Sequence, residues 1–213
     1  MRGITKGAEP ASLTIHRQTA HCDYDNYQDK VALRHALVTE QHGLCCYCMG
    51  RIHNGPDTMK IEHWQCQSGY WAEQLSYHNL LGACLGGNGQ PPNLQHCDTR
   101  KGDRDLQWNP ADPGHHIETR IRYESDGGIC SDEAAFDGQL AAALNLNFPR
   151  LKNNRRSVLT AVLDWWKQEK ARLQGPVSRA QFERERRRRV DECQPYCQVA
   201  VWWLDQRLAR MAA

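Results

Sequence analysis

Two cysteines separated by two residues, Cys45 and Cys48, constrain the fold of this chain more than any other feature. Two thiolates from one tight turn can face a tetrahedral zinc ion, which then needs a second pair from elsewhere. Cys84 and Cys97 are the best candidates, and the twelve residues between them include a segment rich in Gly, Pro and Asn that can loop out. The sequence therefore predicts a structural zinc site with four cysteine ligands.

Other residues compete for this site. Cys46 leaves only one residue before Cys48, which strains a chelating turn, whereas His96 is able to replace Cys97 and stays an alternative. The chain has ten cysteines, and in a reducing compartment clustered cysteines are better explained as metal ligands than as disulfides. For Cys193 and Cys197, which stand four apart with Pro195 between them, we expect burial.

Bulk properties limit the class of protein. No apolar run approaches the roughly 20 residues of a membrane helix, and residues 1–6 lack the apolar segment of a secretory signal, so we expect a folded cytoplasmic protein without a membrane partner. The net charge of +2 is too small for the whole chain to attract a polyanion. Contact with nucleic acid would therefore come from local patches or from a partner.

The pattern of the chain predicts an α+β fold. Residues 1–27 show no sustained period and are expected to form an arm, either loosely ordered or packed on a partner. Apolar residues at helical spacing predict a helix over 28–41. The turn residues Asn54, Gly55, Pro56 and Asp57 predict a hairpin between 50–53 and 59–63, which places His63 at the end of a strand.

The second half is expected to be mainly helical. A weaker hairpin is predicted from 117–123, a turn over 125–128, and Ile129. Helices follow near 133–144, 151–173, 178–193 and 196–211, with a capping box of Ser178 and Gln181 at the start of the third. We divide the chain into the arm 1–27, a zinc-bound domain 28–131 and a helical C-terminal region 132–213.

The catalytic candidates alternate with the cysteines. Metal-assisted hydrolysis of a phosphodiester needs a base for water and a divalent ion on the phosphate, and the adjacent Glu62 and His63 offer both. Asn79 can orient the imidazole, and Asp98 can complete a pair of carboxylates on a magnesium-type ion. Lys101, one helical turn after Asp98, is predicted to face the phosphate.

This ordered series resembles the zinc-stabilised HNH endonucleases and, more narrowly, the PtuB-type HNH proteins of Septu anti-phage systems. The resemblance implies a ββα-metal core with His63 as general base, Asn79 as orienting residue and Glu62 and Asp98 as ligands of Mg²⁺ or Mn²⁺. It also implies structural Zn²⁺ on the four cysteines. Many HNH proteins carry His or Asn at the position of Asp98, so that His78 or His96 can share its task.

The resemblance also implies partners. They are a nucleic-acid substrate, DNA or tRNA, a PtuA-type ATPase, and in retron systems a reverse transcriptase with its RNA–DNA hybrid. A second hypothesis is a catalytically inactive zinc-dependent module that binds nucleic acid or a partner. For contact with nucleic acid we predict basic residues after Cys97 and in two later clusters: Arg100, Lys101, Arg104, Arg155, Arg156, Arg186 and Arg188.

Overall fold

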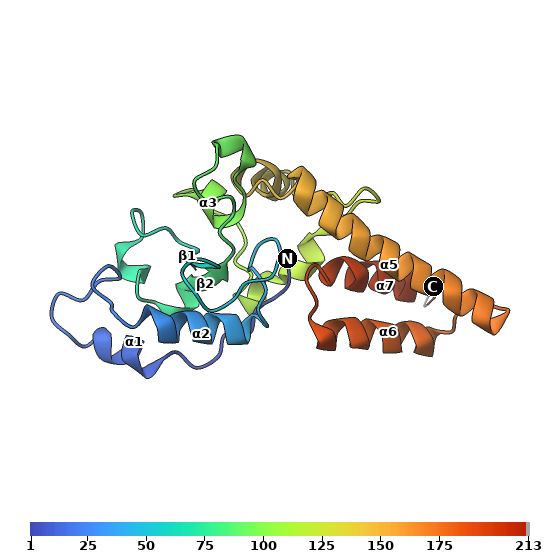
Figure 1. Ribbon diagram of the computed structural model, residues 1–213, viewed down its shortest axis with the longest axis horizontal. Helices are drawn as coiled ribbons and strands as arrows, with labels where there is room; N and C mark the ends of the chain where they lie inside the picture. Colours follow the sequence, from blue (N-terminus) through green and yellow to red (C-terminus); the bar gives the residue numbers. More distant parts are fainter. Residues whose placement is uncertain (212–213) are drawn as a thin grey trace.

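The computed structural model describes residues 1–211, which form an elongated molecule with a small mixed part at one end and a helical part at the other (Figure 1). The fold class is α+β, as predicted, and its two sheets each contain two antiparallel strands. The elements are α1 (Ala11–His16), α2 (Lys30–Glu40), β1 (Lys60–His63), β2 (Leu80–Ala83), α3 (Cys97–Lys101), β3 (Arg122–Tyr123), β4 (Ile129–Cys130), α4 (Ala134–Gly138), α5 (Pro149–Leu173), α6 (Arg179–Glu192) and α7 (Gln198–Arg210).

The first sheet is built differently from the sequence prediction. β1 pairs with β2, with Glu62 opposite Leu81 and His63 opposite Leu80, so the predicted hairpin between 50–53 and 59–63 is wrong. β2 is buried along its whole length, and this allows an apolar run without alternation to form a strand. The pairing places His63 at the end of β1, directly beside the turn that precedes β2.

Helix α2 supports this sheet from below in the view of Figure 1. Leu33 and Leu37, one turn apart, are both fully buried, while the side chain of Asp29 caps the first turn by accepting from the amide of Ala32. The helix ends just before Gly43, where the sequence predicted its end. Gln41 then ties this end to β2, because its side chain donates to and accepts from the backbone of Gly82.

The N-terminal arm packs on its own chain. The amide of Ile4 donates to the carbonyl of Pro110 at 2.8 Å, and Lys6 pairs with Glu40 and donates to the carbonyl of Leu80. The arm also contains α1, which the sequence prediction did not include. Residues 1–27 are therefore an integral layer over α2 and β2.

The second hairpin is confirmed in a shorter form. Arg122 and Tyr123 of β3 pair with Cys130 and Ile129 of β4. The turn requires Gly127, whose φ is +86° and where a Cβ atom would stand 2.1 Å from the carbonyl oxygen of Lys152. Close approach to α5 thus fixes this turn on the helical part.

Three of the four predicted C-terminal helices are found near their predicted bounds, and the capping box at Ser178 is present. The remaining one, predicted over 133–144 and first in the chain, is instead divided into α4 and a π-helical turn over Gln139–Ala143. No helix of the described residues is both long and apolar enough to cross a membrane. Short 3₁₀ turns lie at Trp71–Glu73, Tyr77–Asn79, Pro92–Leu94, Pro113–His115 and Ile117–Arg120.

One continuous apolar core joins the two parts of the molecule. It runs from Leu33 and Leu80 through Phe136 to Leu204. In the helical part the tryptophans add aromatic contacts between helices, such as that of Trp166 on α5 with Trp203 on α7 at 5.8 Å between ring centroids. Because the core is shared, α5 to α7 brace the part of the molecule that carries the cysteines.

Candidate functional site

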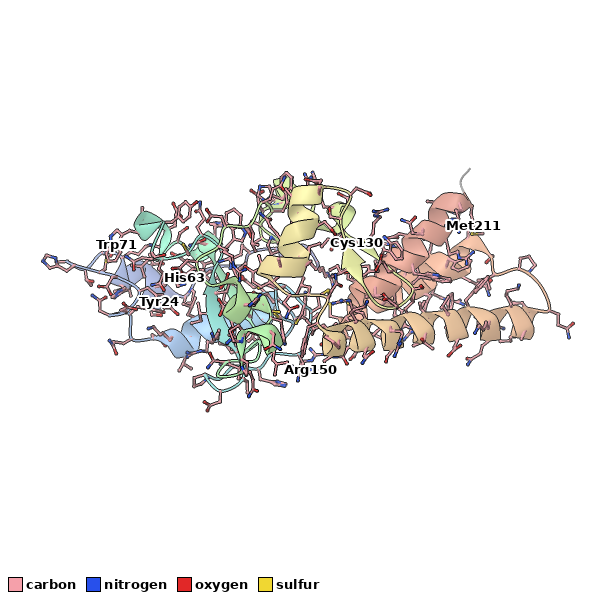
Figure 2. The ribbon with its side chains drawn as sticks, turned by 90° about the horizontal axis from the view of Figure 1, so that it is seen from above. Tyr24, His63, Trp71, Cys130, Arg150 and Met211 are labelled. Atoms are coloured by element: carbon pink, nitrogen blue, oxygen red, sulfur yellow. The ribbon has the colours of Figure 1, made fainter. Side chains whose placement is uncertain are left out.

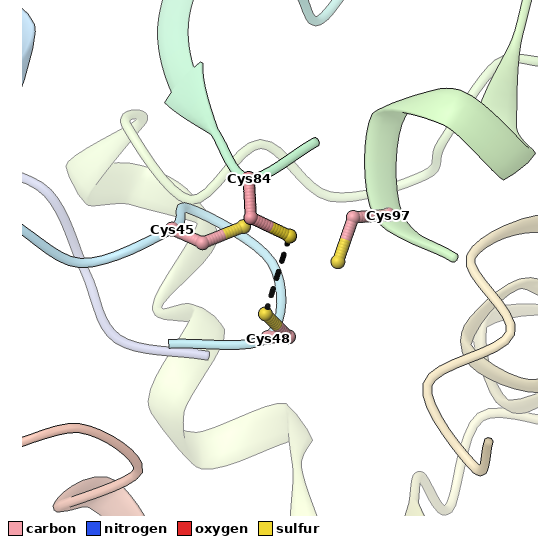
Figure 3. A group of neighbouring side chains, drawn as sticks. All are labelled: Cys45, Cys48, Cys84 and Cys97. Atoms are coloured by element: carbon pink, nitrogen blue, oxygen red, sulfur yellow. Dashed lines mark hydrogen bonds between the residues drawn. The ribbon is translucent and has the colours of Figure 1, made fainter. Parts of the chain in front are cut away.

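The four predicted cysteines come together in one cluster (Figure 3). Cys45 and Cys48 lie in the turn after α2, Cys84 follows β2, and Cys97 begins α3. Their sulfur atoms all lie within 4.8 Å of one another, and those of Cys48 and Cys84 are 3.8 Å apart. Zinc bonds of about 2.3 Å in a tetrahedron put sulfurs about 3.8 Å apart, so the cluster could hold a metal ion such as zinc.

Local backbone geometry builds this cluster. Two backbone amides form hydrogen bonds to the first cysteine pair. The amide of Met49 donates to the carbonyl of Cys45, and the amide of Gly50 donates to the sulfur of Cys48. At the second pair, the segment after Cys84 closes when the amide of His96 donates to the carbonyl of Gly86 at 2.9 Å. The loop between Cys84 and Cys97 thus returns the chain to the site, as its composition predicted.

The thiols of the cluster shift one another's pKa values in opposite directions. Burial alone would raise the pKa of Cys45, but hydrogen bonds from the neighbouring thiols lower it well below its ordinary value. Burial and the same neighbours hold the pKa of Cys97 well above its ordinary value. The cluster therefore favours an ionised Cys45 beside a protonated Cys97, and a divalent cation is what would allow more of the thiols to ionise.

His96 supports the cluster. Its Nδ1 lies 3.2 Å from the sulfur of Cys97, while Arg150 donates to its Nε2 at 3.4 Å. Because a guanidinium only donates, the ring proton of a neutral His96 sits on Nδ1 and points at the sulfur. Burial lowers the pKa of His96, which favours this neutral form. Such a hydrogen bond to a ligand atom is the usual way a second layer of residues fixes a metal site.

His63 is held by the backbone of the loop between β1 and β2. Its Nε2 lies 3.0 Å from the carbonyl oxygen of Gln74, which can only accept, so the neutral ring carries its proton on Nε2 and leaves Nδ1 free to take another. The residue is 7% exposed, and burial lowers its pKa to about 4. The ring is also packed edge-on against Tyr24, with centroids 4.4 Å apart (Figure 2).

Asn79 does not orient the imidazole directly, contrary to the prediction. Its amide donates to the carbonyls of Gln65 and Glu73 at 3.0 Å, and its oxygen accepts from the amide of Gln65 at 2.7 Å. These bonds pin both ends of the loop that carries Gln74. Asn79 thus positions His63 through the backbone of that loop.

Lys101 does not face solvent, so it cannot contact a phosphate as predicted. It is 1% exposed, and its Nζ lies 2.9 Å from Oε1 of Glu62 and 3.0 Å from the carbonyl oxygen of His63. The hydroxyl of Tyr47 donates to the same carboxylate at 2.7 Å. Lys101 is therefore a structural counter-ion that ties α3 to β1.

Asp98 is the carboxylate that lies near both Glu62 and His63. Burial, together with Asp98, raises the pKa of Glu62 well above its ordinary value, and the charge of Asp98 also acts on His63. Lys60 approaches Asp98 at 3.4 Å. Within residues 1–211 the four cysteines are the only group of three or more Cys, His, Asp or Glu side chains close enough to share an ion, so Glu62, His63 and Asp98 do not form such a group.

Most of the residues predicted to contact nucleic acid instead bind other groups of this chain. Arg155 is wrong as a surface contact, because it is 2% exposed and donates to the carbonyls of Gly127 and Leu146 at 2.7 Å. Arg186 pairs with Asp205, and Arg188 pairs with two glutamates of its own helix. Of the others, Arg100 and Arg104 donate to backbone carbonyls around α3, while Arg156 is exposed.

Sequence reasoning missed three residues that shape this site. Tyr47 lies between the first two zinc candidates, and its spacing from them was the only available signal. Gln74 acts through a backbone carbonyl and Tyr24 comes from the N-terminal arm, so neither had a local signal. No protein-family model matches this chain, and no curated protein matches it either.

Proposed function

We propose that this chain is a divalent-ion-dependent HNH endonuclease that hydrolyses phosphodiester bonds of DNA or tRNA. The observation that carries the proposal is the hydrogen bond from Nε2 of His63 to the carbonyl of Gln74, which leaves Nδ1 as the proton acceptor of a ring on which the charge of Asp98 acts. The order of the motifs supports the ββα-metal core, since β1, β2 and α3 follow one another around a cluster of four cysteines.

His63 is the general base of the proposed reaction. Nδ1 takes a proton from water, the water oxygen attacks phosphorus, and the bond from phosphorus to the leaving oxygen breaks. The pKa of about 4 keeps His63 neutral before substrate binds. A phosphodiester anion beside the ring favours the protonated form, so substrate raises the pKa towards the range in which a base is effective.

The carboxylates of Glu62 and Asp98 are the groups that would hold a magnesium or manganese ion, which supplies positive charge to the phosphate and to the leaving oxygen. Two neighbouring carboxyls with a raised pKa at Glu62 fit such a cation, because it would relieve their mutual repulsion. Lys101 and Tyr47 meanwhile fix Oε1 of Glu62, which sets the direction of the carboxylate.

The experiment is cleavage of labelled DNA and tRNA by the purified chain with magnesium or manganese. The variant His63→Ala should abolish cleavage while zinc content and the circular dichroism spectrum stay those of the parent. Since assembly with a partner can be required, the assay is repeated with the co-expressed ATPase. Full cleavage by a well-folded His63→Ala protein refutes His63 as the base.

We further propose that the enzyme is the effector of a cytoplasmic anti-phage complex with a PtuA-type ATPase, in some systems with a retron reverse transcriptase and its RNA–DNA hybrid. The support is the resemblance of the cysteine and Glu62-His63 motifs to the Septu proteins. Copurification with an ATPase encoded beside the gene, and loss of phage resistance in the His63→Ala strain, test this assignment.

A second function is a zinc-dependent binding module without catalysis. It is favoured by one observation: the carboxylate of Glu62 is already paired with Lys101 at 2.9 Å, and the described residues show no ready group of three ligands for a second ion. Retention of nucleic acid without cleavage, with partner and metal present, would support this function over the nuclease.

A further inference from the structure

Two basic side chains on the first two turns of α2 lie beside the proposed catalytic histidine. Nζ of Lys30 stands 4.4 Å from the ring centroid of Tyr24, and the same ring contacts that of His63, with centroids also 4.4 Å apart. The charge of Lys30 acts on His63, where it helps to lower the pKa of the imidazole. Lys30, Tyr24 and the buried His63 therefore form one row of contacting side chains, and Figure 2 labels Tyr24 and His63 in the same part of the molecule.

Arg34 lies one helical turn after Lys30 and extends this row of side chains. Its Nη1 reaches the carbonyl of Lys30 at 3.5 Å, and its charge opposes the effect of burial, which raises the pKa of Tyr24 to about 12. Its Nε is buried and makes no hydrogen bond within residues 1–211. A buried donor without an acceptor is costly, and within the described residues this guanidinium makes only the 3.5 Å hydrogen bond to Lys30, so most of its donors have no acceptor.

Neither cation has an acidic partner in the described part of the chain, unlike Arg186 and Arg188 on α6, which are neutralised by carboxylates. Lys30 also stands in the first turn of α2, where a positive charge is unfavourable because the helix dipole is positive there. Two unneutralised cations therefore remain near the start of α2, one of them in the turn that disfavours positive charge, and an anionic ligand would neutralise both.

We propose that Lys30 and Arg34 bind a phosphate of the nucleic-acid strand, next to the phosphate on which His63 acts. This inference rests on the proposed nuclease function and names the residues that would place its substrate. Arg34 offers a planar fork of donors to phosphate oxygens, and Lys30 offers a mobile point charge. Lys30 contacts Tyr24 and Tyr24 contacts His63, so we place the phosphate that the pair binds next to the one that is cut.

The test measures binding without cleavage. In the His63→Ala background, fluorescence anisotropy follows a labelled DNA duplex and a labelled tRNA over a series of salt concentrations. Arg34→Gln and Lys30→Gln should each lower the slope of log K against log salt by about one and weaken binding about eightfold at about 0.1 M salt. Arg34→Lys should keep most of the slope, because it retains the charge. The two probes show which nucleic acid supplies the phosphate.

Arg187→Gln is the matched control. Arg187 is exposed on α6 in the helical part, and its replacement should leave the salt slope unchanged. Circular dichroism and zinc content show that each variant is folded. An unchanged slope in both Arg34→Gln and Lys30→Gln, or an equal loss in Arg187→Gln, overturns this inference alone, because cleavage by the parent still tests the nuclease separately. A parent that neither binds nor cuts overturns both proposals.

Discussion

The buried state of His63 predicts how the stability of the protein depends on pH. The pKa of its imidazole is about 4 in the folded chain, against an ordinary value of 6.5. The unfolded chain therefore binds more protons between these two values, and stability is full above 6.5 and falls as the pH drops towards 4. The perturbation that isolates this effect is His63→Gln, because the glutamine amide can still donate to the carbonyl of Gln74.

The size of the effect follows from the two pKa values. Between about pH 7.5 and about pH 5, His63 should remove about 2 kcal/mol from the free energy of unfolding. Urea unfolding followed by tryptophan fluorescence, at fixed zinc concentration, gives this free energy for the parent and for His63→Gln at both pH values. Because all other titratable groups are common to the two proteins, the contribution of those groups cancels in the comparison.

The parent should lose about 2 kcal/mol more than His63→Gln over this interval. If the two proteins lose the same stability, His63 is not held neutral by burial, and the assignment of a free Nδ1 fails with it. If His63→Gln loses more, the sign of the argument is wrong.

Other substitutions test the buried charges and the cluster. Lys101→Met should cost about 3–5 kcal/mol, because it leaves Glu62 buried without its counter-ion, and the double variant with Glu62→Gln should recover part of this loss in urea unfolding. Arg155→Met should cost about 2–4 kcal/mol through two unpaired carbonyls, whereas its exposed neighbour in Arg156→Met should stay within about 0.5 kcal/mol; equal effects would contradict the burial. Cys97→Ser should lower zinc content measured by mass spectrometry and make the chain sensitive to proteases, as a chelator should for the parent.

Features of the fold that depend on short-range chemistry could be predicted from the sequence. The spacing of Cys45 and Cys48 gave the first half of the cluster, and the composition of the segment after Cys84 indicated a loop that returns to it. The capping box at Ser178 was likewise a local signal, since its hydrogen bonds join residues three apart.

The errors came from long-range pairing. The turn residues at 54–57 favoured a local hairpin, but β1 finds its partner in β2 because that strand is buried on both faces. Lys101 and Arg155 looked like surface charges, yet each lies where a carboxylate or several backbone carbonyls converge from distant segments. No local pattern reveals such convergence, because it depends on how separate elements meet.

The cysteine cluster draws on three separate stretches of the chain, and the last of them begins α3. An ion bound by the cluster could join all three stretches only after the ribosome has released the chain beyond Cys97, so the connection between β2 and α3 would form only then. If zinc binds there and the fold depends on it, as in structural sites of this kind, a cell that is starved of zinc would still synthesise the polypeptide but accumulate little folded protein. Metal supply would thus set the amount of competent protein independently of transcription.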